Sequence, residues 1–262
     1  KININERLIL WNKFIKHENE KPLIYISIAV IPTRFGGLLK LIENLVSSSV
    51  RPNKIIFQVP KEYLLFNSEG HISKISEILS EHIASGLVYI NILNKDFGPC
   101  NKWQGMIQYY EKNNLIDQNF VSIIIDDDLL YHNYLIEESL NEHYKNNRSV
   151  ITGYNNFTKY GNKIHTLVDN DRTLLLKGGN FTLLPKYFFV VNMNSSFENT
   201  LINSINDNIE DCIFYDDNII TAFLYKKRIN IISIFELIIS KGNNRSYKIN
   251  PICKQNERDG YD

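Results

Sequence analysis

The sequence predicts one α/β domain whose central sheet is mostly parallel and flanked by helices. Short apolar runs rich in Ile and Val alternate with segments whose apolar residues recur every three to four positions. The chain has 262 residues, of which 44% are hydrophobic and 22% charged, the size and composition of a large globular domain. We find no internal repeat and no Pro/Ser-rich linker, so we expect a single domain over residues 1–262.

The predicted elements follow one another regularly in the first half of the chain. Residues 1–20 are predicted to form a leading amphipathic helix, because apolar side chains recur there at helical spacing. The almost continuously apolar run 23–31 is expected to be a strand covered on both faces. Further strands are predicted at 54–59, 87–92, 120–125, 150–153, 181–184 and 229–234, and further helices at 38–45, 72–85, 102–110, 131–144 and 217–227.

Charge and cysteine usage exclude several classes of protein. Lys and Arg together number 29, as do Asp and Glu, so no net charge draws the molecule to nucleic acid, and we expect no nucleic-acid partner. Cys100, Cys212 and Cys253 form no CxxC pair, which favours a reducing, cytoplasmic location over a disulfide framework or a zinc site. No apolar run approaches the about 18 to 20 residues of a transmembrane helix. Because the chain begins at Lys1 rather than Met, a domain excised from a longer or membrane-associated protein stays open.

Several common motifs are missing from the sequence. It contains no GxxxxGK[ST] loop, no GxGxxG fingerprint, no GxSxG elbow and no HExxH. P-loop NTPases, typical dinucleotide enzymes, serine hydrolases and zincins therefore lose support.

The strongest chemical signal is an apolar strand that runs directly into Asp126, Asp127 and Asp128. Three adjacent carboxylates repel one another, so a counter-charge is expected, and a divalent cation is the economical one. In extended backbone Asp126 and Asp128 point to one side and Asp127 to the other. Oxygen ligands favour Mg²⁺ or Mn²⁺, which often complete their shell with phosphate oxygens. The alternative is an acidic turn that caps the next helix.

Two basic residues also follow predicted strands. Asp96 and Lys102 flank a turn at Gly98 and Pro99, where they would hold a nucleotide, or where Asp96 would simply cap the turn. Arg34 follows the first strand and would form a planar fork on a phosphate, or would be a solvated arginine.

Two later pairs of residues are further candidates. Gly178 and Gly179 would let a ligand approach the backbone closely, or would mark a plain turn. Asp216 and Asp217 lie at the start of a predicted helix. An N-cap accounts for one of these acids but does not require two.

Taken together, five segments in this order resemble the GT-A glycosyltransferases. They are Ile-Pro-Thr-Arg at 31–34, Asp-Phe-Gly-Pro at 96–99 with Lys102, Ile-Ile-Ile-Asp-Asp-Asp at 123–128, Gly178-Gly179, and Asp216-Asp217. The similarity runs over about residues 24–234. The DxGPxxK and DDD arrangement is similar to that of exostosin-like transferases and of some viral or bacterial surface-glycan transferases.

The resemblance implies a single GT-A (Rossmann-like) domain and a role in glycan biosynthesis. Residues 21–128 would be the nucleotide-sugar-binding half, 129–240 the acceptor and catalytic half, and 241–262 a tail. The activity would be transfer of a hexosyl or pentosyl group from a UDP-linked donor to a hydroxyl of a glycan or glycoconjugate acceptor. The cofactor would be Mn²⁺ or Mg²⁺.

The resemblance also implies roles for individual residues. Asp126 and Asp128 would be the metal ligands of a DxD motif, with Asp126 on the metal or the ribose. Asp217, or else Asp216, would be the catalytic carboxylate that faces the acceptor. The donor-binding residues would be Pro32, Thr33, Arg34, Asp96, Lys102, Asp126, Asp127, Gly178 and Gly179. One departure is that no histidine follows His165, so a C-terminal histidine ligand of the metal is missing.

Two other functions remain open at this stage. Acids at a strand end also hold Mg²⁺ in nucleotidyltransferases and other phosphoryl-transfer enzymes. A carbohydrate-binding module on a degenerate transferase fold would need no catalysis at all.

Overall fold

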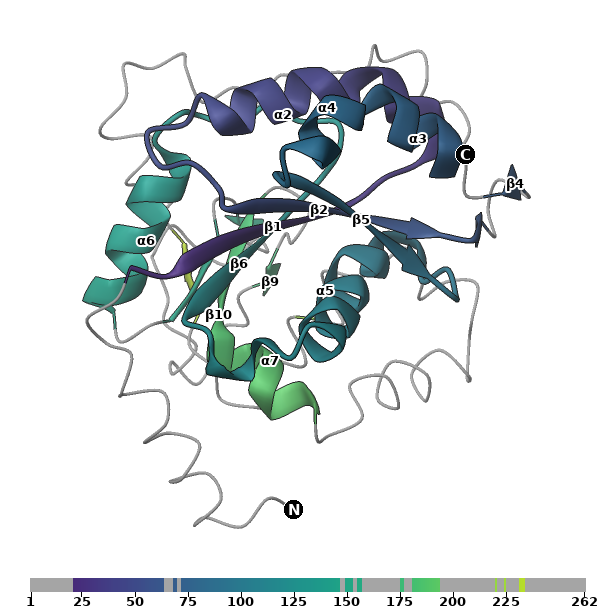
Figure 1. Cartoon of the computed structure of the whole chain (residues 1–262). Helices are drawn as coiled ribbons and strands as arrows, with labels where there is room; N and C mark the ends of the chain where they lie inside the picture. Colours follow the sequence, from purple (N-terminus) through teal and green to yellow (C-terminus); the bar gives the residue numbers. More distant parts are fainter. Residues whose placement is uncertain are drawn as a thin grey trace.

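The protein is described by a computed structural model over residues 21–63, 68–69, 72–146, 149–152, 155–156, 175–176, 181–193, 220, 224 and 231–233. This part is layered, with helices on both faces of a central sheet (Figure 1). The predicted leading helix 1–20 and the tail 241–262 lie outside the described residues. None of the described helices is long and apolar enough to cross a membrane.

Within the described residues the central sheet has seven strands in the order β11-β7-β10-β6-β1-β2-β5. Neighbouring strands are parallel except β10, which is antiparallel to both β6 and β7. The strands are β1 (Leu23–Ala29), β2 (Lys54–Pro60), β5 (Val88–Leu93), β6 (Phe120–Ile125), β7 (Val150–Thr152), β10 (Thr182–Pro185) and β11 (Ile231–Ser233). The prediction of a mostly parallel sheet is thus confirmed.

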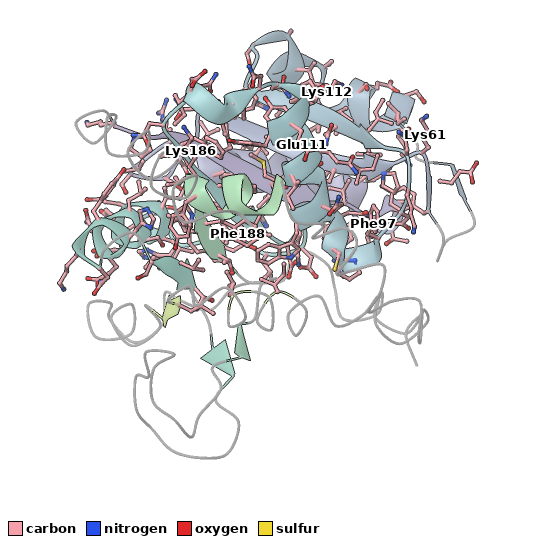
Figure 2. The ribbon with its side chains drawn as sticks, turned by 90° about the horizontal axis from the view of Figure 1, so that it is seen from below. Lys61, Phe97, Glu111, Lys112, Lys186 and Phe188 are labelled. Carbon is pink, nitrogen blue, oxygen red and sulfur yellow. The ribbon has the colours of Figure 1, made fainter. Side chains whose placement is uncertain are left out.

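Each face of the sheet is covered by its own helices, because the apolar side chains of a strand alternate between the faces. Ile24, Ile26 and Ile28 of β1 pack in the core under α2 (Leu38–Val46), α3 (Ile72–Ile78) and α6 (Leu135–Lys145). Tyr25 packs in the other core, under α5 (Asn101–Lys112) and α7 (Lys186–Met193). Figure 2 looks onto that second face, with Lys112 labelled on α5 and Phe188 on α7.

Several boundaries differ from the sequence prediction. The predicted helix 72–85 is divided into α3 and α4 (Ser80–Ala84), because buried Leu79 takes φ −104° and ψ 14°. The first strand ends at Ala29, since Pro32 begins the 3₁₀ helix η1 (Pro32–Gly37). Of the predicted helix 217–227, the described Ile220 and Leu224 are helical and fully buried.

The remaining described elements are short. They are the antiparallel pair β3 (Glu62–Tyr63) and β4 (Ser68–Glu69), the antiparallel pair β8 (Asn155–Asn156) and β9 (Leu175–Leu176), and the 3₁₀ helices η2 (Gly98–Cys100) and η3 (Leu115–Asp117).

The strand order creates a switch point between β1 and β6. From β1 the chain moves to β2 and then to β5 on one side, and it returns to place β6 on the other side of β1. Connections that leave the carboxyl ends of β1 and β6 therefore diverge. In open α/β sheets this is where ligands bind.

Candidate functional site

The candidate site is built from the segments that follow β1, β5 and β6. Asp126, Asp127 and Asp128 come directly after β6, at the carboxyl end of a strand whose six residues are all buried. Arg34 lies on η1, which follows β1, and Lys102 lies in the first turn of α5. The fold brings Arg34 and Lys102, which are distant in sequence, to the acidic turn, where Arg34 pairs with Asp127 and Asp128 and Lys102 pairs with Asp126.

Asp127 ties the ends of β1 and β6 together. Its side chain is 3% exposed, with Oδ1 at 2.7 Å from Arg34 Nη1 and Oδ2 accepting the Ile31 backbone N–H at 3.1 Å. Burial raises the pKa of Asp127 to about 6, although the Arg34 guanidinium opposes this shift. The ionised form of Asp127 is therefore stabilised by the Arg34 guanidinium. A donor-binding role for Asp127 stays a prediction.

Asp128 and Asp126 are the more accessible carboxylates, with side chains 16% and 33% exposed. Asp128 Oδ2 lies 3.2 Å from Arg34 Nη2, so one guanidinium contacts two carboxylates. Asp126 Oδ1 lies 2.9 Å from Nζ of Lys102, whose side chain is 3% exposed. Each outer carboxylate thus contacts a protein cation and also reaches the surface.

Tyr131 and Asn44 support the acidic turn from behind, and the sequence analysis missed both. The hydroxyl oxygen of Tyr131 accepts the Asp126 backbone N–H at 3.1 Å. Asn44 of α2 holds the Tyr131 backbone by two bonds, donating from Nδ2 to its carbonyl at 2.9 Å and accepting its N–H at 2.7 Å. Tyr131 follows the acids closely in sequence, but no local signal identifies Asn44 on a distant helix.

Asp96 has the geometry of a turn cap. Its Oδ1 accepts the Gly98 N–H at 2.9 Å and the Asn101 amide at 2.6 Å. Gly98 has φ 56°, a value that favours glycine. Capping of the turn, the alternative role considered from the sequence, therefore explains these contacts of Asp96. Nucleotide binding by its carboxylate stays a prediction.

Tyr63 is a further residue that the sequence analysis missed. It is 3% exposed and donates its hydroxyl to the Val30 carbonyl at 2.9 Å, at the end of β1. Burial and the charges of Asp96 and Asp127 raise its pKa, which places this phenol near both acids. Its position on a strand of only two residues leaves no periodic signal.

The other predicted site residues lie in η1 or outside the described residues. Pro32 and Thr33 begin η1, and Thr33 is exposed beside Arg34. Gly178, Gly179, Asp216 and Asp217 lie outside the described residues.

The carboxylate oxygens of this site suit a divalent cation whose other ligands do not come from the protein. The turn supplies three carboxylates, against the two cations Arg34 and Lys102. Hard oxygen ligands suit Mg²⁺ or Mn²⁺. Within the described ranges no three acidic, His or Cys side chains form a ready-made metal cluster. Asp126 and Asp128 would therefore hold an ion whose remaining ligands are water and diphosphate oxygens.

Comparisons with known proteins do not assign this chain to a family. No protein-family model and no curated protein matches the chain. A solved structure of Staphylococcus aureus TarS, residues 1–349, is similar with a TM-score of 0.44 and 8% sequence identity. The match covers 65% of this chain and 49% of that one, so the chain spans about half the length of the structure it matches.

Proposed function

We propose that this protein is a metal-dependent glycosyltransferase. It transfers a sugar from a nucleotide-sugar donor, UDP-linked, to a hydroxyl of a glycan or glycoconjugate acceptor. The observation that carries the proposal is the acidic turn Asp126–Asp128 at the switch point between β1 and β6, where carboxylates outnumber cations. A surplus of carboxylates at a ligand-binding edge favours a ligand that arrives with a divalent cation, as a nucleoside diphosphate does.

The proposed roles follow from the contacts of each residue. Asp126 and Asp128 would hold Mn²⁺ or Mg²⁺, which when bound supplies Lewis-acid stabilisation of the charge that grows on the departing diphosphate. Arg34 is anchored on Asp127 through Nη1, and its Nη2, 3.2 Å from Asp128, would turn to a phosphate oxygen. Lys102 would add a second positive charge on the donor side.

The remaining roles rest on the sequence pattern. Gly178 and Gly179 would let the donor approach the backbone. Asp217 would accept the proton of the attacking hydroxyl, which raises the rate by about 10²- to 10⁴-fold if the reaction inverts the anomeric centre. Asp216 would cap the helix that begins there.

The direct test combines donor binding with product identity. UDP-, GDP-, CMP- and dTDP-sugars are compared by thermal shift with and without Mn²⁺, and we expect a UDP-sugar with Mn²⁺ to stabilise the protein most. Incubation with that donor and a glycan acceptor should release UDP. Release of sugar 1-phosphate instead of UDP would show attack at the α-phosphorus and would identify a nucleotidyltransferase. Sugar binding without metal-dependent turnover or donor hydrolysis would identify a binding module.

We expect Lys102→Met to weaken donor binding selectively. The change keeps the packing of the side-chain stem, and Asp126 stays partly solvated because it is 33% exposed. Loss of one charge-assisted contact, worth about 1.5 kcal/mol, should raise the donor Kd about 10-fold while the acceptor KM is unchanged. Mn²⁺ alone should bind no more weakly, since the change removes a nearby positive charge.

Lys186→Met is the matched control for this experiment. Lys186 is also a buried lysine, at the start of α7, where the charge of Asp117 acts on it. Its loss should leave both substrates unaffected. Equal weakening of donor and acceptor by Lys102→Met would contradict the placement of Lys102 on the donor side. Arg34 is less suited to this test, because its removal also leaves buried Asp127 without its counter-charge.

A further inference from the structure

A chain of buried polar side chains crosses the core beneath the candidate site. Ser27 of β1, Gln58 of β2 and Asn91 of β5 come from three neighbouring strands and are 0%, 0% and 3% exposed. Gln58 and Asn91 are direct partners in the parallel register, and Ser27 lies two residues before the partner of Gln58. All three lie on the face that α5 covers, because Ser27 and Asn91 bond to the α5 backbone and Gln58 bonds to both of them.

The hydrogen bonds of this chain run in one direction. Asn91 Nδ2 donates to Gln58 Oε1 at 2.8 Å, Gln58 Nε2 donates to Ser27 Oγ at 2.8 Å, and Ser27 Oγ donates to the Lys102 carbonyl at 2.6 Å. Asn91 Nδ2 also donates to the Gly105 carbonyl at 2.9 Å. That carbonyl can only accept, so it fixes the Asn91 amide and, through it, the amide of Gln58. The chain thus has both of its ends on the backbone of α5.

Gly105 allows the helix to lie this close to the chain. A Cβ at position 105 would overlap the Gln58 side chain. Polar side chains are costly to bury, and apolar side chains of similar size would fill the same space without hydrogen bonds. The arrangement therefore fixes where α5 lies over the sheet, which apolar packing does less specifically.

The residue at one end of the chain also belongs to the candidate site. Lys102 accepts the Ser27 hydroxyl through its carbonyl, while its Nζ lies 2.9 Å from Asp126. We infer that Ser27, Gln58, Asn91 and Gly105 are positioning residues that hold Lys102 against Asp126 by fixing the first turns of α5. The consequence for donor binding rests on the proposed function, whereas the consequence for Lys102 does not.

The test compares Ser27→Ala with Ser139→Ala. Both serines are fully buried, and each donates to a backbone carbonyl at 2.6 Å, Ser139 to Leu135 within α6. Reductive methylation with formaldehyde and a borane, followed by mass spectrometry, measures how accessible each lysine is. Ser27→Ala removes the bond to the Lys102 carbonyl and also the bond that Gln58 donates to Ser27. We expect methylation of Lys102 to be faster on the order of 5-fold, the effect of losing the one buried bond that ends on Lys102. Ser139→Ala should not change it, and buried Lys186 should stay slow in both variants.

Two results would overturn the assignment. Equal methylation of Lys102 in the two variants would show that Ser27 does not position it. Parallel acceleration of Lys102 and Lys186 would show general opening of the fold instead. Gly105→Ala provides a second variant, with Gly36→Ala as control, because an added Cβ at Gly36 meets no atom within 4 Å. Gly105→Ala should expose Lys102 and Gly36→Ala should not.

Mn²⁺ and UDP binding, measured by calorimetry on the same proteins, separates the two proposals. If the unmutated protein binds UDP with Mn²⁺, Ser27→Ala should weaken that binding about 10-fold and Ser139→Ala should not. Unchanged binding in Ser27→Ala would overturn the link from the chain to the site. If the unmutated protein binds neither ligand while Ser27→Ala still exposes Lys102, the proposed function fails and the positioning role stands.

Discussion

Replacing Asp128 with asparagine should abolish donor turnover and Mn²⁺-dependent stabilisation while the protein stays folded. An amide is a much weaker ligand for Mn²⁺ or Mg²⁺ than a carboxylate. The fold should survive because Asp128 is partly exposed and Arg34 keeps its 2.7 Å contact with buried Asp127. The measurements are turnover of the donor and the thermal shift that Mn²⁺ and UDP produce together.

Asp117→Asn is the control for this result, because Asp117 belongs to η3, which immediately precedes β6 and so lies at the opposite end of that strand from the acidic turn. It should leave both turnover and the metal-dependent shift unchanged. A folded Asp128→Asn protein with the same Mn²⁺ dependence as the unmutated one would show that the acidic turn does not hold the metal.

The second large effect is expected at Asp217. If the enzyme inverts the anomeric centre, Asp217→Asn should keep donor affinity and lower turnover by about 10²- to 10⁴-fold, the contribution of a general base. Asp216→Asn should stay active and lose about 1 kcal/mol of stability at most, because asparagine is also a good N-cap. Rates at saturating donor and acceptor, together with denaturant unfolding, distinguish the two variants. Full activity of Asp217→Asn would point to Asp216 as the base or to a retaining reaction.

The elements that the sequence predicts best are those with a strong local pattern. Strand β6 covers Phe120–Ile125 as predicted, because a short and mostly apolar run rich in Ile between polar residues is typical of a strand buried on both faces. The helix predicted from residue 131 instead begins at Leu135. Asn44 holds the Tyr131 backbone outside the helix, and a contact between residues so far apart in sequence leaves no trace in a local window.

The candidate site is likewise predictable from the sequence only in part. The position of three acids at a carboxyl edge follows from the sequence, because parallel strands end together. The fork of Arg34 over Asp127 and Asp128 does not follow, since it depends on how β1 and β6 pair. The same holds for the polar chain under α5, because Ser27, Gln58 and Asn91 are unremarkable polar residues until the register brings them together.

The antiparallel strand β10 has a consequence for the order in which the protein folds. Among the strands that the structure describes, β6, β1, β2 and β5 pair only with one another and with β10, and all four have been synthesised by residue 125. Strand β7, in contrast, pairs with β10 and β11, which are both made later. The nascent chain can therefore complete the four-stranded parallel part early, while β7 waits for a strand from beyond residue 180. Because non-local strand pairing is slow, we expect the addition of β10 and β7 to limit the rate of folding.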